Sequence, residues 1–101
     1  MTFGLSDQQY KILEDLVLSP LKAKGAQVFI FGSRARGQHH PFSDIDVLYV
    51  ENPKIPIGLN EISKITEAIE NSNFAIKVDL VSESSLAASY RASVNEDKIR
   101  I

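Results

Sequence analysis

The sequence predicts an α/β protein in which a small mixed β-sheet is flanked by helices. Short runs of β-branched and aromatic residues at 28–31, 44–50 and 76–81 have the composition of strands. Apolar residues at helical spacing lie before, between and after these runs, and turn-forming glycines and prolines separate the segments. With 101 residues, 44% of them hydrophobic, the chain is expected to form one domain over residues 1–101 with one core.

A helix is expected close to the start of the chain. Ser6 and Gln9 have the spacing of a capping box. Pro20 should end or kink the helix, because proline has no backbone N–H, and Gly25 should close the segment. The apolar residues at helical spacing are Tyr10, Leu13, Leu16 and Val17.

The run 28–31 predicts a buried strand that ends at Gly32. Glycine lets the backbone approach a bound group closely and adopt a turn closed to other residues. Ser33 follows where a helix could begin, and a helix start presents free N–H groups that suit phosphate. Arg34 and Arg36 place cations beside this turn. Arg36 is the better candidate for a phosphate contact and Arg34 a weaker one, and the alternative for both is a solubilising surface charge.

The next strand begins with two carboxylates. Alternate residues of a strand share a face, so Asp44 and Asp46 point to the same side as Leu48 and Val50. Two like charges this close repel each other unless a cation lies between them. Carboxylate oxygens are ligands that suit magnesium bridging the phosphates of a substrate. The pair therefore predicts a metal site.

A third carboxylate, Asp79, lies within the strand expected over 76–81, on the face opposite Ile76, Val78 and Leu80. If this strand lies beside the one that carries Asp44, Asp79 can join the other two acids. Three carboxylates can bind two metals roughly 3.5–4 Å apart, an arrangement used in nucleotidyl transfer.

The remaining segments complete the alternation of helices and strands. Asn52-Pro53 and Pro56 indicate a loop, and Ser82 is a candidate N-cap for a final helix. His39 and His40 lie in a polar loop without zinc-ligand spacing and are expected to be exposed. The helical repeats are Leu59, Ile62, Ile65 and Ile69 before the third strand, and Leu86, Tyr90 and Val94 after it.

The chain contains Gly32-Ser33, ten further residues and then Asp44-Ile45-Asp46. This pattern resembles the signature of the DNA polymerase β-like nucleotidyltransferase superfamily. The short chain resembles the minimal nucleotidyltransferase (MNT) branch. The resemblance implies a polymerase β-like core in which Asp44, Asp46 and Asp79 are catalytic and bind two Mg²⁺ ions. It also implies that Gly32 and Ser33 contact the triphosphate, and that a nucleoside monophosphate, expected to be AMP from ATP, passes to an acceptor.

Other function classes lack their signatures. The chain has no P-loop and no Gly-x-Gly-x-x-Gly turn, and its strand follows the Asp-x-Asp pair, whereas in a phosphatase the strand would precede it. A net charge of −2 without a basic block disfavours a long nucleic-acid acceptor. Without cysteine, a membrane-length apolar run or a signal peptide pattern, the expected compartment is the cytoplasm, with no membrane partner.

The resemblance also suggests a partner protein. Minimal nucleotidyltransferases are commonly encoded beside a helical HEPN-type ribonuclease toxin and act as its antitoxin, by binding it or by attaching AMP to it. A catalytic antitoxin and a non-catalytic one that neutralises its partner by occlusion both remain open. Transfer to a small molecule is less favoured, because the chain offers no acceptor domain. Exposed apolar residues on the last helix or at Ile99 and Ile101 would support an interface in either case.

Overall fold

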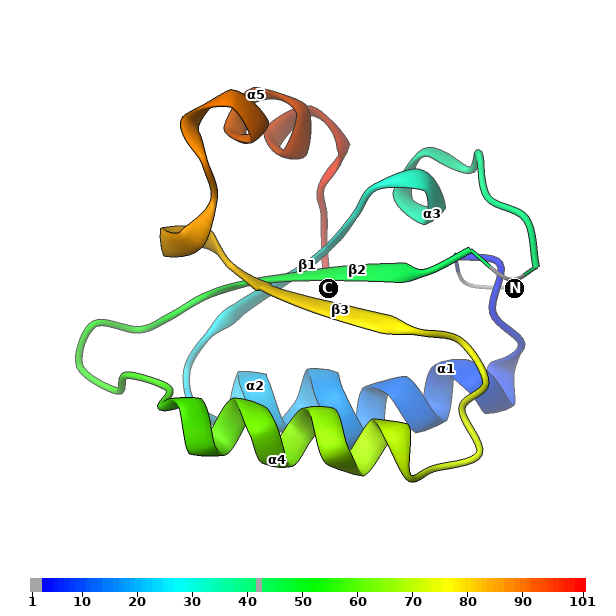
Figure 1. Cartoon of the computed structure of the whole chain (residues 1–101), viewed down its shortest axis with the longest axis horizontal. Coiled ribbons are helices and arrows are strands. Elements are labelled where there is room, and N and C mark those ends of the chain that lie inside the picture. Colours follow the sequence, from blue (N-terminus) through cyan, green and yellow to red (C-terminus); the bar gives the residue numbers. More distant parts are fainter. Residues whose placement is uncertain (1–2, 42) are drawn as a thin grey trace.

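The computed structural model describes residues 3–41 and 43–101, and its centre is a four-stranded mixed sheet (Figure 1). The strands lie in the order β3-β2-β1-β4, where β1 is antiparallel to β2 and to β4, whereas β2 and β3 are parallel. Helices lie on both sides of the sheet, so the predicted fold class is confirmed. The strands are β1 (Gln27–Phe31), β2 (Ile45–Val50), β3 (Val78–Ser82) and β4 (Ile99–Arg100).

One face of the sheet is covered by the N-terminal helices and by α4 (Figure 1). Alternate strand residues such as Ile45, Val47 and Val28 pack there, in the main core. The helices contribute residues that are 0–1% exposed, among them Leu13 and Leu21. The elements are α1 (Asp7–Leu13), the π-helical segment η1 (Glu14–Leu18), α2 (Ser19–Ala23) and α4 (Leu59–Glu70).

The first helix starts as predicted but does not end at Pro20. The Ser6 hydroxyl accepts a hydrogen bond from the Gln9 N–H, and the Gln9 side chain accepts one from the Ser6 N–H, which confirms the capping box. The helical path continues through Pro20 to Ala23, because η1 widens the turn ahead of the proline, where the missing N–H would otherwise break the ladder. Gly25 then closes the segment with a φ of 77°.

The predicted helix over Leu59 to Ile69 is present as α4, although its apolar face is shorter than expected. Ile69 is buried and Ile62 and Ile65 pack against the main core. Leu59, the first residue of the helix, is 87% exposed and does not belong to this core. The core face therefore begins one turn into the helix.

The opposite face carries α3 (Ser33–Arg36) and α5 (Ala88–Asp97), which lie above the sheet in Figure 1. The prediction that Ser82 caps the last helix is wrong, because Ser82 ends β3 and precedes the 3₁₀ turn η2 (Glu83–Ser85). The unpredicted β4 follows α5 and pairs with β1. A second, smaller core lies under α5 and consists of Phe29, Leu48 and Val94, with Phe31, Val50, Val81 and Leu86 packed around them.

Within the described part of the chain, no helix has the length and apolar character needed to cross a membrane.

Two glycines provide a matched test of this backbone. Gly25 has a φ of 77°, which favours glycine, and an added Cβ would approach the Asn52 Nδ2 atom to 3.1 Å. Gly58 is the N-cap of α4, has a φ of −77° and has open space around it. We expect Gly25→Ser to lower the free energy of unfolding by about 1–2 kcal/mol through backbone strain. Gly58→Ser should raise it by about 0.5 kcal/mol by adding a capping hydroxyl. Urea denaturation of both variants and the wild type measures the difference, and equal effects of the two serines would contradict the assigned conformations.

Candidate active site

The site begins at the turn between β1 and α3. Gly32 has a φ of 79° and a ψ of −157°, a conformation that side chains exclude, and α3 starts at the next residue, Ser33. The Gly32 carbonyl accepts hydrogen bonds from the Ala35 and Arg36 N–H groups at 3.1 and 3.2 Å. A Cβ atom on Gly32 would overlap the Asp46 carboxylate. The predicted phosphate turn and one of the predicted metal ligands are therefore immediate neighbours.

Parallel pairing of β2 and β3 brings the second and third acids together. Asp46 lies opposite Asp79 in the register, and both share the sheet face that carries Leu48 and Val81. Asp46 is half-buried, and the Asp79 side chain is 41% exposed. Asp44 is exposed and lies one residue before β2, two positions from Asp46.

The electrostatics show that these carboxylates lie close together. The pKa of Asp46 is raised from 3.8 to about 6, first by burial, then by the negative charges of Asp79 and Asp44, and a hydrogen bond with Asp79 acts in the same direction. The Arg36 cation opposes this shift in part. The site therefore concentrates negative charge that a cation would relieve.

The carboxylate oxygens of the site fit a hard divalent cation whose remaining ligands are waters or substrate phosphates. Asp46 and Asp79 offer paired carboxylate oxygens, with Asp44 beside them. Among residues 3–41 and 43–101, no three His, Cys, Asp or Glu side chains form a ready-made metal-binding group. Magnesium usually keeps several waters and is held by one or two carboxylates plus substrate phosphates, so this arrangement suits it.

Arg36 lies beside the acids but already has a partner. Its Nη1 atom is 2.6 Å from the Oδ2 atom of Asp97 at the end of α5, and its Nε atom donates to Gln38. Its side chain is 43% exposed, so it is accessible from solvent. The cation is close enough to Asp46 to offset part of the rise in the pKa of that carboxyl.

Arg34 and His39 differ from their predictions. Arg34 is 2% exposed and donates hydrogen bonds to three backbone carbonyls, so it is neither a surface charge nor free to contact phosphate. His39 packs against Gly4 and is half-buried, and its Nδ1 atom is buried without a hydrogen-bond partner. His40 is exposed, as expected.

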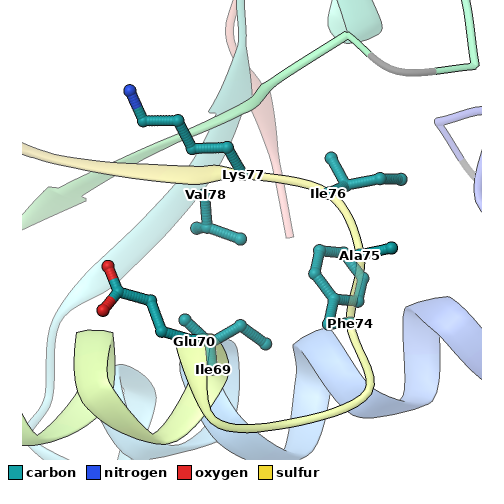
Figure 2. Close-up of a pocket in the computed structure, with 7 residues that line it drawn as sticks. All are labelled: Ile69, Glu70, Phe74, Ala75, Ile76, Lys77 and Val78. Carbon is teal, nitrogen blue, oxygen red and sulfur yellow. The ribbon is translucent and has the colours of Figure 1, made fainter.

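Lys77 is a residue near the site that the sequence reasoning missed. Its Nζ atom is 3.7 Å from the Oδ1 atom of Asp79. Figure 2 shows its side chain pointing away from Val78 and from the hollow of about 290 Å³ between the end of α4 and β3. The signal was available, because Lys77 precedes Asp79 by two positions in an extended segment and so shares its face. Asp97 gave no comparable signal, since its contact depends on how α5 packs.

A comparison with models of protein families matches residues 8–101 to the nucleotidyltransferase domain. The chain therefore belongs to the nucleotidyltransferase domain family, as its Gly-Ser turn and acidic strands indicated. None of the curated proteins compared with the chain matches its sequence significantly.

Solved structures refine this assignment. A protein described as a candidate minimal nucleotidyltransferase is 30% identical, with a TM-score of 0.72, and the match covers 96% of this chain and 97% of the other. A toxin–antitoxin structure with AMP-PNP is 20% identical, with a TM-score of 0.66, over 86% of this chain and 70% of the other. A mutant of the MntA–HpeT toxin–antitoxin pair is 18% identical, with a TM-score of 0.64, over the same shares. The last two likenesses show a common fold.

Replacing Asp46 should stabilise the metal-free protein. Above pH 6 its ionised carboxylate lies where burial and two neighbouring acids disfavour it, and screening by solvent limits the cost to about 1–2 kcal/mol. The folded state binds the proton more tightly than the unfolded state, so this cost disappears as the pH falls from about 6 towards 3.8.

We expect Asp46→Asn to raise the free energy of unfolding, measured by urea denaturation in EDTA, at pH 8 and to have little effect on it at pH 4. Asp15→Asn, at an exposed pair with Lys11, is the control. Equal curves for wild type and Asp46→Asn would contradict the assigned charge cluster.

Gly32 and Gly37 give a second matched pair. Both have a positive φ, 79° and 73°, but only at Gly32 does an added Cβ meet Asp46, while Gly37 has open space. Below the unfolding transition, Gly32→Ala should weaken binding of a nucleoside triphosphate by about tenfold or more, because the turn and the acid must move apart. Gly37→Ala should lower only stability, by about 1 kcal/mol. Calorimetric titration of both folded variants tests this, and unchanged affinity in Gly32→Ala would contradict close backbone approach there.

Proposed function

We propose that this chain, as a single nucleotidyltransferase domain, transfers a nucleoside monophosphate, with AMP from ATP as the expected donor, to a hydroxyl of a partner protein. The observation that carries the proposal is the register that sets Asp46 beside Asp79 and against the Gly32 turn. Family membership supports nucleotidyl transfer in general. The AMP-PNP in one structural neighbour favours an adenine nucleotide as the donor.

The residues divide the reaction between them. Gly32 and Ser33 contact the triphosphate, and Arg36 exchanges Asp97 for a phosphate oxygen. Asp44, Asp46 and Asp79 would hold Mg²⁺, two ions in the fullest arrangement, which when bound neutralises charge on the phosphates and the leaving group. The acceptor oxygen attacks the α-phosphorus, the bond to the oxygen that bridges to the β-phosphorus breaks, and pyrophosphate leaves. Asp79, whose side chain is 41% exposed, assists removal of the hydroxyl proton.

A HEPN-type toxin is the partner that we propose, with this chain as its antitoxin. Two of the structural neighbours are toxin–antitoxin structures, and one of them names the pair MntA–HpeT. The chain also leaves apolar side chains exposed on the expected surface, with Tyr90 of α5 at 65% and Ile99 at 43%. Ile101 differs from that expectation, because it packs against the main core.

The alternative is an antitoxin that acts by occlusion alone. The exposed apolar residues would serve such a complex equally well, and Leu59 at 87% and Ile55 at 44% add to them. This candidate assigns no catalytic role to the carboxylates. The raised pKa of Asp46 favours the enzyme, because a neutral residue at that position would fold at lower cost.

A transfer assay separates the two candidates. Purified protein, Mg²⁺ and each nucleoside triphosphate labelled at the α-phosphate are mixed with the product of a neighbouring gene. Label should appear on the partner with wild type and with the Asp15→Asn control. It should fall about 100-fold or more with Asp44→Asn and Asp46→Asn, which remove proposed ligands of the metal that would neutralise the reacting phosphates. Wild-type labelling by both variants would refute the site, and a silent but tight complex without label would favour occlusion.

A further inference from the structure

The buried guanidinium of Arg34 donates to three backbone carbonyls in two separate segments of the chain. Its Nε atom donates to the Ser43 carbonyl at 3.0 Å, Nη1 to the Phe3 carbonyl at 2.8 Å, and Nη2 to the Pro41 carbonyl at 3.3 Å. These acceptors lie in the N-terminal segment and in the loop between α3 and β2. A single side chain thus links the first turn of α3 to both.

The environment of this cation makes the contacts obligatory. Arg34 is 2% exposed and pairs with no carboxylate in the described part of the chain, so only the carbonyls replace its lost hydration. Phe3 has a left-handed φ of 54°, which costs a non-glycine residue about 1 kcal/mol and persists only where the surroundings hold it. The bond to Arg34 is one such restraint on Phe3.

The two ends of this link lie at the two halves of the site. Arg34 directly follows Ser33 of the phosphate turn, and Ser43 directly precedes Asp44. Ser43 also closes a turn of its own, because its N–H donates to the His40 carbonyl and its hydroxyl accepts from the His40 N–H, both at 3.0 Å. Without Arg34, this turn would lose its attachment to α3, and its internal bonds, including the one made by the Ser43 N–H, would open more often.

We propose that Arg34 is a positioning residue, whose guanidinium holds the backbone at Ser43 so that exposed Asp44 is presented beside Asp46 at a fixed distance from the Gly32–Ser33 turn. This inference rests on the proposed metal role of Asp44. Asp46 needs no such help, because it lies within β2 and is held by the sheet. Asp44 lies before the strand, so its position depends on the loop that Arg34 anchors.

The test compares the whole chain carrying Arg34→Met with wild type and with Arg91→Met, which removes an exposed arginine paired with Glu83. Amide exchange by NMR is measured at Ser43 and at Leu48, below the unfolding transition, and Mn²⁺ binding is measured from paramagnetic broadening. In Arg34→Met we expect exchange at Ser43 to accelerate by about tenfold or more while Leu48 is unchanged. Mn²⁺ affinity should fall by about 10–100-fold, the usual effect of losing a group that orients a ligand.

Should Arg34→Met not fold, Arg34→Lys gives the same comparison, because one nitrogen cannot span three carbonyls.

The results distinguish this inference from the proposed function. Folded Arg34 variants with wild-type Mn²⁺ affinity and wild-type exchange at Ser43 would overturn the inference and leave Arg34 with a role in stability alone. If Asp44→Asn weakens Mn²⁺ binding and Arg34→Met does not, only the positioning role fails. If Asp44→Asn binds Mn²⁺ as wild type does, the metal role of Asp44 fails, and the positioning role fails with it.

Discussion

The parallel pairing of β2 with β3 is the constraint on which the rest of the site depends. The apolar residues Ile45 and Val47 on β2, and Val78 and Leu80 on β3, face the main core. A slip of one residue would turn them towards the opposite side and bury carboxylates in their place. Packing on one face therefore fixes which acids meet on the other. The pairing of Asp46 with Asp79 is a consequence of the core and needs no separate device to align the two acids.

The charge balance of the site is distributed over elements that are distant in sequence. Arg36 at the end of α3 and Lys77 just before β3 each contact a carboxylate, but Arg36 contacts Asp97 of α5 whereas Lys77 contacts Asp79. Both cations are substantially exposed, so solvent screens them and neither pair contributes much to stability. Arg36 offsets the raised pKa of Asp46 only in part, because burial and then the charges of Asp79 and Asp44 act in the opposite direction.

The parts of this structure that were predictable from sequence are those set by local periodicity. Strand alternation places Asp44 and Asp46 on the same side of the chain, and the capping box of Ser6 and Gln9 needs only neighbouring residues. The meeting of Asp46 with Asp79 required in addition that β2 and β3 pair in parallel, which local periodicity does not determine. Arg34 could not be placed in this way, because its three acceptors come together only when the N-terminal segment and the loop before β2 fold over α3. The pairing of β4 with β1 likewise depends on α5 returning the chain to the sheet. The predicted roles of the site residues remain predictions.

The π-helical segment Glu14–Leu18 has a consequence for relatives of this chain. A π turn holds one more residue than an α turn over the same length, and here it lets both Val17 and Leu18 reach the core. A relative that lacks one residue in this segment could form an uninterrupted α-helix whose two ends occupy the same places. Its sequence would then align with this one only through a gap in the middle of a helix, at a position where insertions and deletions are ordinarily excluded.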